Sequence, residues 1–250
     1  MMKVHSCDIL ILIAMQAEAS TLVEKLGLIS FTAPELALLP ARSYQGSYQG
    51  LNIVLVTQGQ ATDGNFDYVG TQFAAVTSWA AIGAFSPAFI LNAGTAGGFI
   101  QQGAKIGDVY VNAKGCLYHD RRIGIPSYEP FCKSAIPSQI AINLNQHLPW
   151  LKPGLISTGN ALDTYPEEIA RIQSSGAQVK EMEAATIAEI AALFNLEIIA
   201  LKSITDHLDG EHVSADEFLE NLHLASAKLT EATIKVIDFL TEASPLVGQA

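Results

Sequence analysis

The chain has 250 residues, which is long enough to bury a sizeable hydrophobic core and short enough to form one domain, so we expect a single domain over residues 1–250. Its 14 Lys and Arg residues are outnumbered by 25 Asp and Glu residues, which gives a formal net charge of −11. Such an acidic surface repels polyanions, so nucleic acid and acidic membrane faces are excluded as expected partners, and a small neutral or cationic ligand is favoured.

Apolar runs rich in β-branched residues alternate along the chain with helical patterns. In chain order we predict a strand at 8–14, a helix at 18–26, a hairpin of 43–48 and 51–57, a helix at 66–82 ended by Gly83, strands at 89–93 and 108–111, a helix at 184–194, a strand at 197–201 and a helix at 214–240. This alternation is typical of a three-layer α/β fold with a central, mixed but mostly parallel twisted sheet flanked by helices. Ligands of such folds bind beyond the carboxyl ends of the strands.

Two features of the sequence predict where the protein works. The apolar stretch 9–15 is too short to span a bilayer and is followed by polar residues rather than a cleavage site, so it predicts a buried strand and not a signal peptide. Cys7, Cys116 and Cys132 are widely spaced and lack the spacing of a zinc site, which predicts free thiols in a reducing compartment. We therefore expect a cytoplasmic protein.

Three acidic residues come directly after predicted strands. Glu18 lies at the start of the first predicted helix, where the partial positive charge of the peptide dipoles favours an ionised carboxylate. Glu183 and Asp206 end the segments 178–183 and 203–206. A lone acid in any of these places would be interpreted as structural, but the three together predict a shared pocket at the carboxyl edge of the sheet.

The glycine-rich run Asn92-Ala-Gly-Thr-Ala-Gly-Gly98 also follows a predicted strand. Its small residues let a ligand approach the backbone, but its spacing is neither a dinucleotide-binding nor a P-loop pattern. A tight turn and a binding loop therefore both stay open for it. His119 and His207 are also ambiguous, because an isolated histidine near a loop is more often solvated or hydrogen-bonded than catalytic.

Six motifs resemble those of the 5′-methylthioadenosine/S-adenosylhomocysteine nucleosidase family, in the family's order and over about residues 8–240: Ala14-Met-Gln-Ala-Glu18, the glycine-rich run 92–98, Tyr118-His-Asp120, Ser157-Thr-Gly-Asn160, Glu181-Met-Glu183 and Ser203-Ile-Thr-Asp206. The match looks most like the plant-type methylthioadenosine nucleosidases. The resemblance implies a nucleoside phosphorylase-like fold and hydrolysis of the N-glycosidic bond of 5′-methylthioadenosine, and of S-adenosylhomocysteine as a second substrate, in methionine salvage. It implies no metal and no organic cofactor.

The resemblance also assigns roles to individual residues. Glu18 corresponds to the base that activates the attacking water, Asp206 to the acid that protonates N7 of adenine, and Glu183 to the carboxylate that binds the ribose hydroxyls. The implied substrate-binding residues are Thr95, Ala96, Gly97, Leu162, Lys180, Glu181 and Met182. These residue types fit the chemistry, because adenine leaves poorly as an anion and needs a proton, while positive charge builds on the ribose ring.

Two positions depart from the family pattern. Asn160 occupies the place of a common aspartate, and Ala215 falls where bacterial enzymes of dual specificity have an aromatic residue near the 5′-alkylthio group. Both departures concern substrate range rather than the acid and the base. They leave the substrate range open, and the plant-like pattern favours methylthioadenosine over S-adenosylhomocysteine.

Two other functions compete with hydrolysis. A phosphate-dependent nucleoside phosphorylase needs arginine to bind the phosphate dianion, and this chain has Asn92 where such enzymes carry an arginine before the glycine run. A non-catalytic nucleoside-binding or storage protein of the same fold would have no need for all three carboxylates. The sequence therefore favours a hydrolase.

The resemblance implies a homodimer. The apolar stretch 66–82 can serve either the core or a subunit interface. The irregular segment 115–130, with Arg121-Arg122, is expected to be a loop over a pocket.

Overall fold

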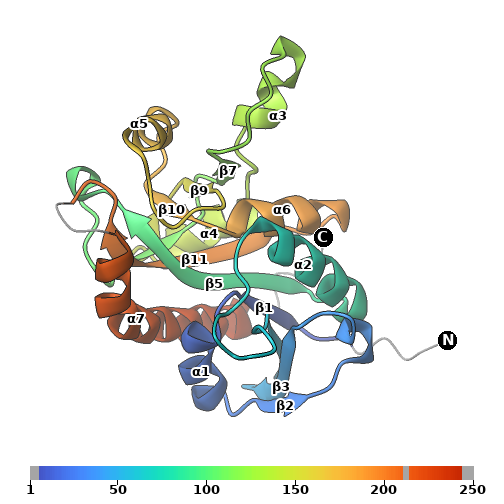
Figure 1. The fold of residues 1–250 in the computed structure, drawn as a ribbon. Helices are drawn as coiled ribbons and strands as arrows, with labels where there is room; N and C mark the ends of the chain where they lie inside the picture. The colour runs from blue at the N-terminus through green and yellow to red at the C-terminus, as the bar shows by residue number, and fades with distance from the viewer. Residues whose placement is uncertain (1–5, 211–213, 244–250) are drawn as a thin grey trace.

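A central mixed sheet runs through the molecule and is covered by helices on both faces (Figure 1). The computed structural model describes residues 6–210 and 214–243. The strands of this part are β1 (Ile9–Ile13), β2 (Ile29–Phe31), β3 (Arg42–Tyr48), β4 (Leu51–Thr57), β5 (Phe89–Gly98), β6 (Val109–Val111), β7 (Cys116–Tyr118), β8 (Lys152–Pro153), β9 (Ile156–Thr158), β10 (Val179–Glu181) and β11 (Ile198–His207). Its α-helices are α1 (Gln16–Lys25), α2 (Thr71–Phe85), α3 (Glu129–Lys133), α4 (Gln139–His147), α5 (Pro166–Ser174), α6 (Ala184–Leu193) and α7 (Ser214–Ala243). The predicted α/β architecture is confirmed.

The sheet is built outward from β1 and β5. Strand β1 pairs in parallel with β4 and with β5, and β5 also pairs in parallel with β11. Beyond β5 the order continues through β10 and β9 to β7, while β6 and β8 branch from β11. The predicted hairpin is present as antiparallel β3 and β4. Parallel pairs therefore bring the carboxyl ends of β1, β5 and β11 to one edge.

Strand β1 divides the hydrophobic core into two layers. All five of its residues are buried, and alternate side chains point to opposite faces of the sheet. Leu10 and Leu12 pack with residues of α2 and α6, whereas Ile9, Ile11 and Ile13 pack with residues of α1, α4 and α7. None of the helices within 6–210 and 214–243 is long and apolar enough to cross a membrane.

Helix α2 differs from its prediction at both ends. It begins at Thr71 rather than at residue 66, after Gly70, whose φ of 91° suits glycine. It also continues through Gly83, where the sequence predicted its end, and stops at Phe85, before Ser86 in the left-handed region at φ 42°. Gly83 therefore lies inside the helix rather than capping it.

Strands β5 and β11 are longer than predicted. The glycine-rich run belongs to β5, so it is neither a tight turn nor a loop, and Asp206 lies inside β11 rather than after it. Residues of β11 are aligned with β5 up to Gly98, and β10 pairs with β5 at Gly97 and Gly98. Pairing on both edges keeps the run extended despite the low strand propensity of glycine.

The segment 115–130 is not a loop throughout, because Cys116–Tyr118 form β7 of the sheet; residues 119–133 form an arm. After β7 the chain leaves the body of the molecule and returns through α3, which projects from the rest of the fold (Figure 1). Arg121 is anchored at the base of the arm by two hydrogen bonds of 2.9 and 2.7 Å to the Glu189 carboxylate of α6.

Replacing Gly83 by alanine should stabilise the protein. Glycine inside a helix costs about 0.5–1 kcal/mol relative to alanine, and a Cβ at this exposed position meets nothing within 4 Å. The free energy of unfolding in urea should therefore rise by that amount. In Gly98→Ala, the matched control, the new Cβ would lie 2.7 Å from Ala104 Cβ, and the loss should be about 1–3 kcal/mol. A destabilised Gly83→Ala variant would show that α2 does not continue through this residue.

Candidate active site

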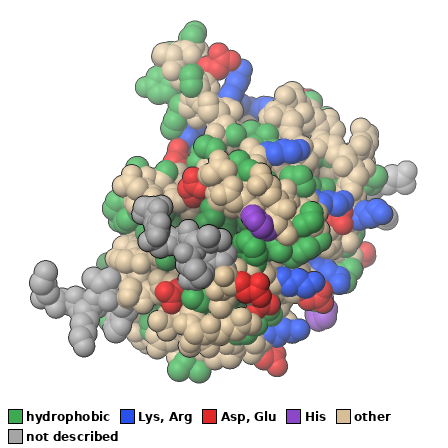
Figure 2. Space-filling view, turned by 180° about the vertical axis from the view of Figure 1, so that it is seen from behind, with side chains coloured by type: hydrophobic (Ala, Val, Ile, Leu, Met, Phe, Trp, Pro, Cys, Tyr) green, Lys and Arg blue, Asp and Glu red, His purple; other side chains and the backbone are tan. Residues whose placement is uncertain are grey.

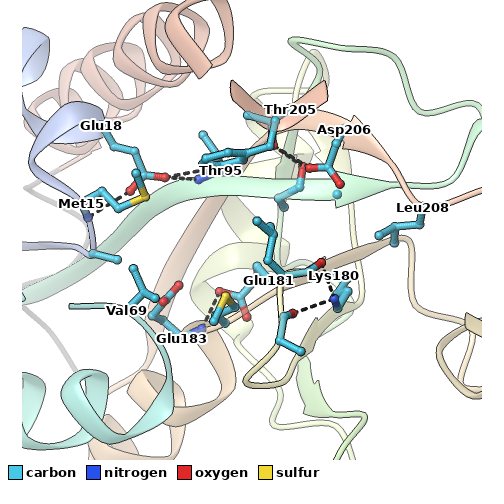
Figure 3. A pocket seen from close by; sticks show the side chains of 17 residues that line it. Met15, Glu18, Val69, Thr95, Lys180, Glu181, Glu183, Thr205, Asp206 and Leu208 are labelled. Atoms are coloured by element: carbon cyan, nitrogen blue, oxygen red, sulfur yellow. Dashed lines mark hydrogen bonds between the residues drawn. The ribbon is translucent and has the colours of Figure 1, made fainter. Parts of the chain in front are cut away.

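One cavity opens at the carboxyl edge of the sheet, where β1, β5, β10 and β11 meet α1 (Figure 3). All ten residues proposed from the sequence line it: Glu18, Thr95, Ala96, Gly97, Leu162, Lys180, Glu181, Met182, Glu183 and Asp206. In Figure 3, Glu18 lies on the left, Asp206 on the right and Glu183 below them. Three carboxyl groups that are far apart in the sequence thus share one cavity.

Glu18 is held by the start of its own helix and by β5. Its Oε2 accepts a hydrogen bond from the backbone N–H of Met15 at 3.2 Å, and its Oε1 accepts from the N–H and the hydroxyl of Thr95 at 2.8 and 2.7 Å. The side chain is buried. A carboxylate has about four acceptor positions, so these three bonds fix Glu18 and leave Oε2 able to accept another donor.

The glycines of β5 let other groups approach its backbone. A Cβ at Gly97 would lie 2.7 Å from Leu208 Cδ2 and 2.9 Å from Asp206 Oδ2, and a Cβ at Gly94 would lie 3.1 Å from Lys202 Nζ. Neither glycine has a positive φ. Their role is therefore to leave space for the side chains of β11, rather than to make a turn.

A β-bulge in β11 turns Asp206 toward the cavity. Ile204 is aligned with Ala96, but the next aligned residue is Asp206, opposite Gly97, so Thr205 is an extra residue. Successive side chains of a regular strand point to opposite faces, yet Thr205 and Asp206 both line the cavity. The Thr205 hydroxyl donates to Asp206 Oδ1 at 2.8 Å.

Beneath the cavity, Lys202 and Glu181 form a buried ion pair. The Lys202 ammonium lies 2.7 Å from Glu181 Oε2, and both side chains are 1% exposed. Burial disfavours the charged form of each, but the pairing outweighs it: the pKa of Glu181 lies below its usual value, and the pKa of Lys202 lies above its usual value. The Glu181 carboxylate also accepts from the N–H groups of Glu183 and Ala184 and from the Thr158 hydroxyl. Glu181 therefore fixes the start of α6 at the edge of the cavity.

Glu183 has a raised pKa. Burial raises its pKa from 4.5 to about 7, with the nearby charges of Glu181 and Glu18 acting in the same direction. The Lys202 ammonium and a 2.8 Å hydrogen bond from the Gly70 N–H oppose the shift without cancelling it. A carboxyl group that titrates near neutrality in a cavity marks a functional site.

Lys180 supports the wall of the cavity that contains Leu162. Its ammonium donates to three consecutive backbone carbonyls, those of residues 161, 162 and 163, at 2.7–2.9 Å. This contact fixes the segment that carries Leu162, a half-exposed wall of the cavity. Asn160 fixes the same segment to α2, because its Oδ1 accepts from the Thr71 N–H and hydroxyl at 2.9 and 3.0 Å.

Seven lining residues were not predicted from the sequence: Ala14, Met15, Val69, Ala161, Thr205, Leu208 and Phe218. Phe218 is the most informative of them. Ala215 is exposed and does not line the cavity, but Phe218, three residues farther along α7, contributes an aromatic wall. The signal was the i, i+3 spacing of a helix, which places both residues on the same face.

Other positions considered from the sequence lie outside this cavity. The His119 ring is buried between Ser157 Oγ and Glu168 Oε1, each 2.9 Å from one ring nitrogen. Asn92 donates its amide to the carbonyl of Leu12 at 3.1 Å. The arm borders a separate cavity with Arg121 and Arg122 rather than covering this one.

Comparisons with known proteins place this geometry in context. Residues 8–238 match the model of the phosphorylase superfamily. The chain is 38% identical to a 5′-methylthioadenosine/S-adenosylhomocysteine nucleosidase of Arabidopsis thaliana over 93% of this chain and 91% of that protein, and 39% identical to a 5′-methylthioadenosine nucleosidase of the same plant over 93% and 87%. The apo structure of an Arabidopsis thaliana 5′-methylthioadenosine nucleosidase superimposes with a TM-score of 0.86 at 36% identity, covering 98% of both chains.

The raised pKa of Glu183 predicts a pH dependence of stability. A carboxyl group whose pKa is higher in the folded state favours folding below pH 4.5, and this contribution is lost as the pH rises to about 7. The loss is on the order of 3 kcal/mol, and Glu183→Gln should not show it, because the amide stays neutral. Urea unfolding of both proteins at pH values on either side of this window measures the difference. Parallel pH profiles would contradict the shift.

Proposed function

The chain belongs to the phosphorylase superfamily and within it to the methylthioadenosine nucleosidase family, and we propose that it hydrolyses the N-glycosidic bond of 5′-methylthioadenosine to adenine and 5-methylthioribose. The observation that carries the proposal is the convergence of Glu18, Glu183 and Asp206 on one cavity. The products suit methionine salvage. No metal ion or organic cofactor takes part in the proposed reaction.

Asp206 and Glu18 divide the proton transfers. Asp206 donates a proton to N7 of adenine while the bond between C1′ and N9 breaks, and the bonding electrons leave with the base. A water molecule forms the new bond to C1′ and gives its proton to Glu18, whose Oε2 still has an acceptor position. Asp206 lies beside Gly97, whose lack of a side chain leaves room for the Asp206 carboxyl group at the cavity.

Glu183 binds the ribose hydroxyls in this scheme. Its Oε1 is fixed by the N–H of Gly70, so its orientation is set before the substrate arrives. The excess of carboxyl groups around the cavity favours the positive charge that develops on the ribose ring. Lys180 and Glu181 act on this site by positioning the 161–163 segment and the start of α6.

The cavity favours water over phosphate as the nucleophile. A phosphate dianion needs cationic partners, and arginine is the usual one. Among the residues of 6–210 and 214–243 that line the cavity, none is an arginine, and the ammonium of Lys180 is already bonded to three carbonyls. The same three carboxyl groups argue against a protein that only binds or stores nucleosides.

The proposed range of substrates includes S-adenosylhomocysteine as the poorer one. The plant relatives include one named for both substrates and one named for methylthioadenosine alone, at similar identity. A side-by-side comparison of kcat/KM on the two nucleosides tests this preference.

Adenine release in a phosphate-free buffer tests the proposed reaction. The purified chain should convert methylthioadenosine to adenine and methylthioribose, and Glu18→Gln and Asp206→Asn should each lower kcat about 10²–10⁴-fold, because each amide loses its proton-transfer role. Glu35→Gln, at an exposed glutamate outside the cavity, should keep the parent rate. Strict phosphate dependence with formation of a sugar 1-phosphate would contradict hydrolysis, and unchanged methylthioadenosine would favour a binding protein.

We also propose that the chain is a cytoplasmic homodimer. Its three cysteines are free and buried, which fits a reducing compartment. Trp79 of α2 and Phe131 of the arm are each more than half exposed. Figure 2 shows hydrophobic side chains on the projecting arm together with charged ones, a composition that suits a subunit interface.

Light scattering after size exclusion tests the dimer. The parent protein should have twice the chain mass of 26.7 kDa, and Phe131→Asp and Trp79→Asp should shift it toward the monomer, because a charge at the centre of an apolar contact is costly. Leu38→Asp changes a fully exposed leucine and should leave the mass unchanged. A parent protein that elutes as a monomer at micromolar concentration would contradict the dimer.

A further inference from the structure

The bulged end of β11 pairs with β5 on one edge, and on its other edge it is bound by side chains of α7 rather than by a strand. Strand β6 is aligned with β11 only as far as Ser203. Beyond that point, the carbonyl of Thr205 accepts a hydrogen bond from Asn221 Nδ2 at 3.1 Å, and the N–H of His207 donates to Glu217 Oε2 at 2.8 Å. The two α7 side chains thus take over the role of a partner strand.

These two contacts lie on either side of Asp206. One binds the backbone of the residue before it and the other the backbone of the residue after it. The second contact is reinforced, because Glu217 Oε1 lies 2.7 Å from His207 Nδ1, with the His207 and Glu217 side chains only 17% and 11% exposed. Asn221 Nδ2 is oriented by a second hydrogen bond of 3.0 Å to the carbonyl of Glu217.

From this geometry we propose that Glu217 and Asn221 are positioning residues for Asp206, an inference that rests on the proposed role of Asp206 as the general acid. A bulge has an unpaired residue and is the part of a strand whose conformation the ladder determines least. Here β5 fixes one edge of the bulge, and Glu217 and Asn221 fix the other. They hold the Asp206 carboxyl group beside Gly97, at the cavity in which the purine would bind.

The contacts of Glu217 and Asn221 with β11 also link the position of Asp206 to that of Phe218 in the cavity wall. Phe218 follows Glu217 directly and lines the cavity. When the first turns of α7 dock on β11, they set the direction of Asp206 and bring Phe218 into the site together. Loss of either contact should therefore weaken acid catalysis first, because it releases the backbone of residues 205–207.

Two substrates with different leaving groups separate this role from a general effect on folding. Adenine needs a proton to leave, whereas the 4-nitrophenolate of 4-nitrophenyl 5-methylthioriboside leaves as a stable anion without one. Asp206→Asn serves as the reference and should lower kcat at least about 10²-fold on methylthioadenosine, with less than about a threefold change on the nitrophenyl substrate.

Glu217→Ala and Asn221→Ala should show the same selectivity in weaker form. We expect kcat on methylthioadenosine to fall about 10- to 100-fold, since small misplacements of a catalytic group have effects of this size, and kcat on the nitrophenyl substrate to stay within about threefold. Glu217→Gln keeps an oxygen that can accept from the His207 N–H and should retain most of the activity. Glu220→Ala, at an exposed position of the same helix, is the matched control and should be unchanged.

The outcomes separate the two proposals. If Asp206→Asn is selective but Glu217→Ala and Asn221→Ala lower both substrates equally, or lower neither, the positioning role is overturned and the general acid stands. If Asp206→Asn itself lowers both substrates equally, the general acid is overturned and the positioning role with it. Glu217→Ala and Asn221→Ala remove different contacts, so either one that folds with the parent melting temperature decides the question.

Discussion

The buried ion pair between Lys202 and Glu181 is the contact that holds the site together. It joins β11 to β10, and through the other hydrogen bonds of Glu181 it also fixes β9 and the first turn of α6. Burying either charge alone would cost several kcal/mol, so each residue depends on the other and on the hydrogen bonds around them. Because Glu183 precedes α6 directly, its position follows from this pair.

The same pair explains how several carboxyl groups can share one cavity. One ammonium lies close enough to Glu18, Glu181 and Glu183 for all three to raise its pKa, and it offsets part of their mutual repulsion. The pKa of Glu181 stays below its usual value, whereas the pKa of Glu183 is raised to about 7. The remaining negative potential is in the right place for a reaction that builds positive charge on a sugar ring. The cavity therefore keeps an excess of negative charge, and the Lys202–Glu181 ion pair reduces the repulsion between its carboxyl groups.

The sequence predicted those parts of the structure that depend on local pattern. The continuous apolar run of β1, the alternation of the β3–β4 hairpin and the acids near strand ends were all visible in it, and the family motifs brought the site residues together. What it did not predict depends on distant partners. Glycine often ends a helix, but here α2 continues through Gly83 to Phe85 because the residues next to Gly83 pack on the sheet. Phe218 was missed because its place in the cavity depends on how α7 docks.

The extents of β5 and β11 were missed for a related reason, which also shows how the site is built. Gly94, Gly97 and Gly98 have low strand propensity, and Lys202 and Ser203 interrupt the apolar pattern after residue 201, so each segment alone resembles a strand that has ended. Together they form a matched pair: the missing side chain of Gly97 makes room for Asp206 and Leu208, and the extra residue in β11 turns Asp206 toward that space. Neither feature is useful without the other, because a Cβ on β5 would push the carboxyl group away and a regular β11 would point Asp206 or Thr205 to the opposite face. The direction of Asp206 is therefore set by the pairing of β5 with β11 and by the hydrogen bonds from α7 to β11, and this support is more rigid than a loop.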